Sequence, residues 1–110
     1  MSYQETIEVS TDTHGEMNDI TDQVNRIIAA SGVEVGLAHI FNVGSTGVIT
    51  TIEYEPGLEK DFPVMLDQLI PQRRDYGHEA AWMDGNAHSH LQASLAGPSL
   101  TVPVNGKTAI

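Results

Sequence analysis

Glycine and proline divide this chain into short segments, and the spacing of apolar residues changes from one segment to the next. Gly32, Pro71 and the Gly97-Pro98 pair each follow a run with a regular apolar pattern, and Glu55-Pro56-Gly57 separates two further runs. Because glycine and proline punctuate helices and strands, no single element can be long. The chain is therefore expected to fold as several short elements joined by turns.

Two segments have the apolar spacing of a helix. The first is expected to begin with Thr21 as N-cap and to stop at Gly32, a residue favoured just beyond a helix end. The second runs from Leu58 to Ile70, where Pro63 is tolerable only near the first turn, and Pro71 ends it. The apolar stripe of the first helix consists of Ile20, Val24, Ile27 and Ile28.

Other segments have the composition of strands. Thr6–Ser10 alternates between apolar and polar residues, as a half-buried strand does. Val35–Asn42 and Thr46–Glu53 are rich in β-branched residues and flank a turn sequence, which predicts a hairpin. Ser99–Val104 reads as a strand in which Pro103 indicates an edge or a bulge. The order of elements predicts an α+β fold with a mainly antiparallel sheet and two helices, formed by residues 1–110 as one domain.

The charge balance excludes several kinds of partner. Fifteen acidic residues stand against five basic ones, for a formal charge of −10. No run of Lys or Arg can neutralise a nucleic acid backbone, and an anionic membrane surface is disfavoured. The sequence shows no apolar stretch long enough to span a bilayer and no leader at its start, so a cytoplasmic protein is expected. Without cysteine, a metal site must use His, Asp, Glu or Asn.

Three of the five histidines lie between Tyr76 and His90. His88 and His90 are two residues apart, and in an extended strand both imidazoles would lie on one face, close enough to hold one metal ion. His78 can supply a third ligand. The segment from His88 to Ala93 fits either a strand or a short helical turn. The alternative is a polar loop whose histidines are solvated side chains.

Further candidates lie in the turns on either side of a predicted strand. Ser45 and Thr46 can offer hydroxyl and backbone N–H groups to a phosphate, or can belong to an ordinary hairpin turn. Glu53 is the last residue of the predicted strand Thr46–Glu53. Its side chain either points into a polar pocket or extends into solvent at the end of the strand. In a pocket, its carboxylate can orient a ligand histidine or act as a general base.

Asp84 and Asn86 flank Gly85 at the end of a long polar loop that spans Gln72 to Asn86. A loop of this length in a compact domain is more often functional than idle. Asp-Gly-Asn is also an ordinary turn tripeptide whose side chains bond their own backbone. A role facing a ligand and a role in the turn both stay open for Asp84 and Asn86.

Three motifs together resemble the YjbQ family: T-T-I-E-Y-E-P-G at Thr50–Gly57, D-G-N-A-H-S-H at Asp84–His90 and S-L-A-G-P-S-L-T-V-P-V at Ser94–Val104. The resemblance runs in order through nearly the whole chain. It implies an α+β subunit that assembles as a homotrimer with a polar, histidine-containing site. It also implies synthesis of thiamine monophosphate from a hydroxymethylpyrimidine diphosphate and a thiazole phosphate, and it favours the pocket position for Glu53.

Two departures from the family pattern stand out. Many relatives have H-T-S where this chain has Gly44-Ser45-Thr46, and those relatives tend to lack the histidine found here as His88. Relatives also continue past a turn like Asn105-Gly106-Lys107 into a strand with a G-T-W-Q motif, whereas this sequence stops at Ile110. A C-terminally shortened member of the family, either a fragment or a degenerate form, is expected.

The leading functional hypothesis is an enzyme of small phosphorylated metabolites. Its divalent metal, expected to be zinc, would be held by His78, His88 and His90 with one position open, because three neutral imidazoles and a water form a known catalytic arrangement. Glu53, Asp84 and Asn86 are the candidate catalytic residues, and Ser45 and Thr46 the candidate phosphate contacts. The alternatives are a trimeric protein that binds a metabolite or metal without turnover, and a metal-dependent hydrolase.

Overall fold

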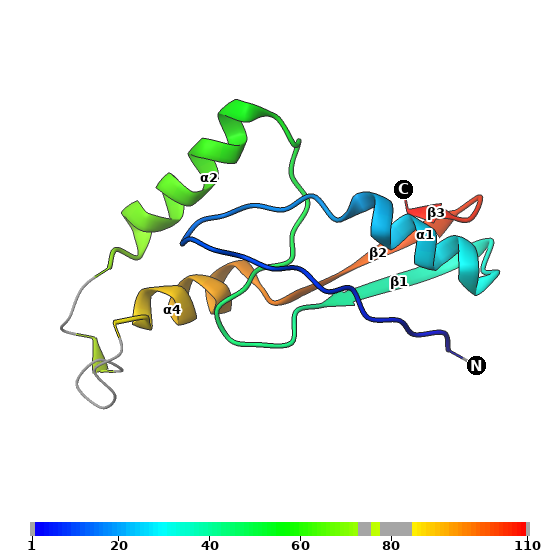
Figure 1. Cartoon of the computed structure of the whole chain (residues 1–110), viewed down its shortest axis with the longest axis horizontal. Helices are drawn as coiled ribbons and strands as arrows, with labels where there is room; N and C mark the ends of the chain where they lie inside the picture. Colours follow the sequence, from blue (N-terminus) through cyan, green and yellow to red (C-terminus); the bar gives the residue numbers. More distant parts are fainter. Residues whose placement is uncertain (1, 73–75, 78–84, 110) are drawn as a thin grey trace. The chain divides into compact units, whose positions relative to one another are not determined.

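The computed structural model of this chain describes residues 2–72, 76, 77 and 85–109 (Figure 1). It divides into two compact units, one of residues 1–40 and 101–110 and one of residues 41–100. The described elements confirm the predicted α+β class, with helices and an antiparallel sheet. They are α1 (Thr21–Ser31), β1 (Val35–Phe41), α2 (Pro56–Leu69), α4 (Ala87–Ala96), β2 (Ser99–Asn105) and β3 (Thr108–Ala109).

Helix α1 forms where the apolar stripe predicts it. Gly32 ends it in the left-handed conformation (φ 78°), and the Gly32 N–H donates to the carbonyl of Ala29 at 3.3 Å. The prediction of Thr21 as N-cap is wrong by one residue, since Ile20 holds that position. Asp19 supplies the capping oxygen instead, because its carboxylate accepts from the Thr21 N–H at 3.0 Å and from the Thr21 hydroxyl at 2.6 Å. These bonds hold the pKa of the Asp19 carboxyl below its usual value.

A tight hairpin joins the last two strands. Gly106 and Lys107 both have positive φ, 65° and 67°, which is the geometry of a type I′ turn. Asn105 pairs with Thr108 in antiparallel register. β3 also contacts α1. The side-chain oxygen of Asn25 accepts a hydrogen bond from the Ala109 N–H at 3.0 Å. The hairpin thereby fixes the helix to the sheet.

The sheet has the strand order β1-β2-β3, so β2 is its central strand. β1 and β2 are antiparallel, because Lys107 N–H donates to the Glu34 carbonyl at one end and Asn42 N–H donates to the Pro98 carbonyl at the other. Pro103, for which the sequence predicts an edge or a bulge, lies just before the two residues of β2 that pair with β3, Val104 and Asn105. The imino acid is tolerated because the short β3 pairs with the two residues that follow Pro103, so the ladder on that side does not reach it.

Two predicted strands are not strands in this structure. Thr6–Ser10 and Thr46–Glu53 are described as extended or irregular chain. The hairpin predicted between Val35–Asn42 and Thr46–Glu53 is wrong, because Thr46–Glu53 forms no strand and the described neighbour of β1 in the sheet is β2. A strand needs a hydrogen-bonded neighbour, and a favourable composition cannot supply one. The bond from Ile49 N–H goes to the Gly97 carbonyl at 3.2 Å, at the end of α4.

Helix α2 begins earlier than its apolar spacing predicts. Glu55 is its N-cap, and the Glu55 carboxylate accepts from the N–H groups of Gly57 at 2.9 Å and Leu58 at 2.5 Å. Pro56 is tolerated at the first position because its missing N–H would have no partner there. The restriction of Pro63 to the first turn is wrong, since Pro63 lies inside the helix and removes one of its backbone bonds.

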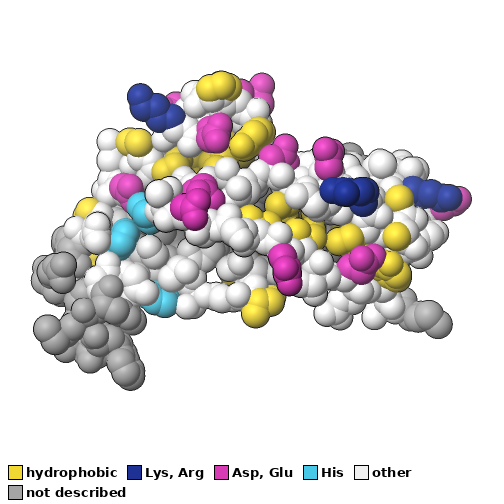
Figure 2. Space-filling model, in the orientation of Figure 1, with side chains coloured by type: hydrophobic (Ala, Val, Ile, Leu, Met, Phe, Trp, Pro, Cys, Tyr) yellow, Lys and Arg dark blue, Asp and Glu magenta, His cyan; other side chains and the backbone are white. Residues whose placement is uncertain are grey.

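Few side chains in the described part of the chain are removed from water. No large side chain there is completely buried. None of the described helices is both long and apolar enough to cross a bilayer. Figure 2 shows acidic side chains at many places on the visible face and basic ones at few, as the charge of −10 requires. The buried apolar residues are Ile28, Leu66, Ala87, Ala93 and Val104.

We expect Glu55→Ala to destabilise the protein by about 1 kcal/mol, because two N–H groups of the first turn of α2 lose their acceptor. Urea unfolding followed by circular dichroism measures this difference. Glu53→Ala is the matched control, since Glu53 is an exposed glutamate just outside the helix, and its effect is expected to stay within about 0.5 kcal/mol. Equal effects of the two changes would contradict the capping role.

Candidate functional site

The histidines of the H-S-H motif lie in a helix. Of the two alternatives left open by the sequence, a strand is wrong, and the helix is longer than a single turn: α4 runs from Ala87 to Ala96 after Asn86 as N-cap. Alanine, leucine and glutamine, which are strong helix formers, make up more than half of the segment. It ends at Gly97, whose φ of 100° favours glycine and whose N–H donates to the Ala93 carbonyl at 2.8 Å.

The helix changes the relation between the two imidazoles. Residues two apart in a helix are separated by about 200° around its axis, so their side chains do not face each other. His88 is 5% exposed, whereas His90 is half-buried. The expectation that both imidazoles lie on one face, which depended on an extended strand, is therefore wrong.

The buried side of α4 faces α2. His88 and Gln92 are four residues apart and so share a face of the helix, and both are buried. The Gln92 side-chain N–H group donates to the Asp67 carboxylate at 2.9 Å and to the Ile70 carbonyl at 2.9 Å. Asp67 lies in α2, and Ile70 is its C-cap. The face that carries His88 is thus the one held against the end of α2.

The third proposed ligand, His78, and the candidate Asp84 lie outside the described residues. Among the described residues, no group of three His, Asp or Glu side chains is close enough to hold a metal ion. The three-imidazole site therefore stays a prediction. In the described helix α4, the side chains of His88 and His90 leave the helix in different directions.

Asn86 lies immediately before the helical histidines. It is half-buried, its carbonyl accepts from the N–H groups of Ser89 at 3.0 Å and His90 at 3.2 Å, and its side chain does not cap the helix. This position puts a carboxamide beside the helix N-terminus, where the helix dipole favours negative charge. Of the candidate residues, Asn86 and His88 lie within one helical turn of each other at the start of α4.

Ser45 and Thr46 are exposed, in a loop whose two ends are tied to the other end of α4. The N–H of Asn42 donates to the Pro98 carbonyl at 2.8 Å, and that of Ile49 donates to the Gly97 carbonyl at 3.2 Å. A helix of this length spans about 15 Å. The two ends of the Ser45–Thr46 loop are therefore separated by most of α4 from the histidine turn, which is the first turn of α4 and carries His88 and His90. Glu53 is exposed as well, and the phosphate and catalytic roles of these residues stay predictions.

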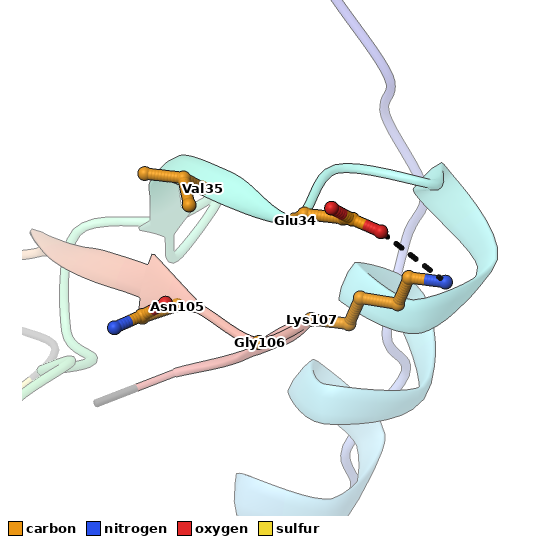
Figure 3. Close-up of a pocket in the computed structure, with 5 residues that line it drawn as sticks. All are labelled: Glu34, Val35, Asn105, Gly106 and Lys107. Carbon is orange, nitrogen blue, oxygen red and sulfur yellow. Dashed lines mark ion pairs between the residues drawn. The ribbon is translucent and has the colours of Figure 1, made fainter.

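A shallow hollow in the other compact unit contains none of the candidate residues (Figure 3). Its lining residues are Glu34, Val35, Asn105, Gly106 and Lys107. The Lys107 ammonium lies 4.0 Å from the Glu34 carboxylate, and both side chains are exposed. An exposed pair of this kind contributes at most about 1 kcal/mol to stability, as a surface contact at a hairpin turn does.

These features define a small α+β protein with a histidine-bearing helix. Residues 5–110 match the family model described as UPF0047 protein YjbQ-like. A UPF0047 protein of Methanothermobacter thermautotrophicus is 38% identical over 102 residues, which cover 93% of this chain and 70% of that protein. The UPF0047 protein YugU of Bacillus subtilis is 31% identical, over 93% of this chain and 76% of its own length. The chain belongs to the UPF0047 YjbQ-like family, as its motifs predict.

Solved structures support the same assignment. A YjbQ-type protein of unknown function from Sulfolobus solfataricus superimposes with a TM-score of 0.86 at 35% identity, covering 93% of this chain and 72% of that one. An uncharacterised member of the YjbQ/UPF0047 family from Clostridium acetobutylicum gives a TM-score of 0.75 at 33% identity, with coverage of 84% and 69%. These structures share the fold of this chain.

Sequence reasoning missed the polar residues that hold the candidate helix. Gln92 lies outside the three family motifs, and Glu55 stands in the sequence only as part of the Glu55-Pro56-Gly57 separator and of a family motif, not as a helix cap. The available signal was the spacing of His88 and Gln92 within a segment rich in helix formers, since two polar residues four apart share a helical face. An acidic residue just before Pro56 was likewise a signal for a helix start.

We expect His88→Ala to lower the free energy of unfolding by about 1–3 kcal/mol, because a buried side chain is removed from the face that packs toward α2. His90→Ala, a change of the same size two residues away, is expected to cost less, since His90 is half-buried. Chemical denaturation of both variants gives the comparison. A larger loss for His90→Ala would contradict the assignment of the buried face.

Proposed function

We propose that this chain is an enzyme of small phosphorylated metabolites and acts as a secondary thiamine-phosphate synthase. The observation that supports this most is the burial of His88 in the first turn of α4. Asn86, two residues before His88, is the N-cap of that helix. An imidazole and a helix N-terminus can both donate to phosphate oxygens. Membership of the YjbQ-like family supports the choice of reaction, through the resemblance carried by the motifs around Glu53 and His88.

In the proposed reaction, the thiazole nitrogen attacks the methylene carbon of the hydroxymethylpyrimidine diphosphate. A carbon–nitrogen bond forms, the carbon–oxygen bond to the diphosphate breaks, and pyrophosphate leaves with the bonding electrons. The protein can assist by stabilising the charge on the leaving group. Because the chain carries a formal charge of −10, its overall field repels anions, and the stabilising groups have to be local donors.

The helical geometry limits what a metal can contribute. His88 and His90 leave α4 in different directions, so one ion bound to both requires their side chains to bend toward each other. We propose that His78, His88 and His90 bind one zinc ion, and we assign no step of the reaction to it. Zinc bound there would supply Lewis-acid chemistry.

We also propose that the chain forms a homotrimer. Side chains on one face of β1 are strongly exposed: Val35 is 77%, Leu37 76% and Phe41 56% exposed. Because successive residues of a strand alternate between faces, these three lie on one face of β1 with the exposed His39 between Leu37 and Phe41, and we call them the apolar stripe of β1. Exposed apolar patches of this kind mark interaction surfaces in proteins that are otherwise polar outside.

The synthase proposal is tested by incubating purified protein with both precursors and magnesium, and measuring thiamine monophosphate by its fluorescent oxidation product. We expect product, with the rate about 100-fold lower in His88→Gln and unchanged in Ser94→Ala, an exposed position on the same helix. Precursor binding without product would point to a binding protein instead. Hydrolysis of simple phosphoesters that stops on chelation would indicate a hydrolase.

Metal binding is measured separately by elemental analysis of freshly purified protein. We expect about one zinc per chain, and a loss of most of that zinc in His88→Ala, since His88 would be one of three protein ligands at a site whose fourth position is open. The exposed His39 serves as the control, with His39→Ala expected to keep the metal. Zinc content that is unchanged in His88→Ala, or absent from the unaltered protein, would count against the site.

The trimer proposal predicts that Leu37→Asp reduces the assembly to monomer, because it places a charge in the apolar stripe of β1. Sedimentation equilibrium measures the mass of both species. Leu69→Asp is the control, since Leu69 is also exposed but lies on α2. A monomeric mass for the unaltered chain would overturn the proposal.

A further inference from the structure

Gln92 joins two helices through both hydrogens of one amide group. It is a buried polar residue, and its side-chain nitrogen lies 2.9 Å from the Asp67 carboxylate and 2.9 Å from the Ile70 carbonyl. A buried amide that lost these acceptors would have an unsatisfied donor in a dry environment. The contact therefore has strict geometric requirements, unlike the apolar contacts of the neighbouring Ala93.

The partners of Gln92 are both at the negative end of α2. The last carbonyls of a helix have no partner within the helix, and the helix dipole places partial negative charge there. Asp67 adds a carboxylate to that end, and the last turn of α2 contains no basic residue. The Gln92 amide is thus a neutral hydrogen-bond donor from α4 that contacts the negatively charged end of α2.

The same contact fixes the direction of the candidate imidazoles. His88 is one helical turn before Gln92 on the same buried face of α4. Rotation of α4 about its axis would break both bonds of the Gln92 amide and would turn His88 and His90 together. We propose that Gln92 is a positioning residue, which sets the rotation of α4 against α2 and so the direction in which His88 and His90 project. This inference rests on the proposed function of the histidine turn.

The decisive variant is Gln92→Glu, which keeps the size of the side chain and replaces its donor by an acceptor facing Asp67 and the Ile70 carbonyl. Gln68→Glu is the matched control, because Gln68 is an exposed glutamine on α2 and undergoes the same chemical change. Two measurements are made on each protein: the imidazole resonances of His88 by NMR, and kcat and KM for thiamine monophosphate formation.

In Gln92→Glu we expect shifted or broadened His88 resonances, with helix content retained by circular dichroism. kcat is expected to fall about 10- to 100-fold while KM changes little, as displacement of a correctly oriented group does. Adding Asp67→Asn to Gln92→Glu supplies an amide donor to the new carboxylate and is expected to restore part of both signals. Gln68→Glu should match the unaltered protein in every measurement.

The positioning role is overturned if the His88 resonances and kcat of Gln92→Glu match those of the unaltered protein, or if Gln68→Glu changes them equally. If Gln92→Glu does not fold, Asp67→Ala removes one of the two bonds and is judged by the same His88 resonances, where no shift would overturn the proposal. If the unaltered protein forms no product, the synthase proposal fails, and the NMR comparison alone still decides the role of Gln92.

Discussion

Scarce burial is the constraint on which the arrangement of this chain depends. Among the described residues, each compact unit buries only a few small or medium apolar side chains, such as Ile28 and Val104 in one and Leu66 in the other. Apolar packing is non-directional, and a small core leaves elements free to rotate or slide. Directional hydrogen bonds between elements therefore carry much of the specificity: Gln92 joins α4 to α2, and Asn25 joins α1 to β3.

The parts of the fold that could be predicted are those determined by local signals. The apolar stripe ending at Gly32 gives α1, and Asn105-Gly106-Lys107 gives a tight turn, because glycine conformations and helical periodicity depend on a few adjacent residues. Strand pairing depends on distant residues. Thr46–Glu53 has the composition of a strand but forms none here, and the described neighbour of β1 is the distant β2. The pattern alone could not show which segment would be the neighbour.

The candidate site shows the same division between local and distant information. The sequence could identify the histidine turn, but it could not choose between a strand and a helix for the residues after Asn86. That choice decides whether His88 and His90 share a face, because the side-chain period is two in a strand and 3.6 in a helix. The helix separates them and groups His88 with Gln92. The phosphate and catalytic roles of Ser45, Thr46 and Glu53 depend on tertiary positions that no local pattern encodes.

Charge and apolar exposure act against each other in any assembly of this chain. Copies that each carry a formal charge of −10 repel one another, and salt screens this repulsion over about 10 Å at moderate ionic strength. The apolar stripe of β1, with Val35 and Leu37 about three-quarters exposed, favours association at short range. The repulsion is long-ranged and spread over the surface, whereas the attraction requires one specific face. In the proposed trimer, copies that meet in the wrong orientation gain repulsion without burial, so the acidic surface would make association selective for the face that carries the stripe.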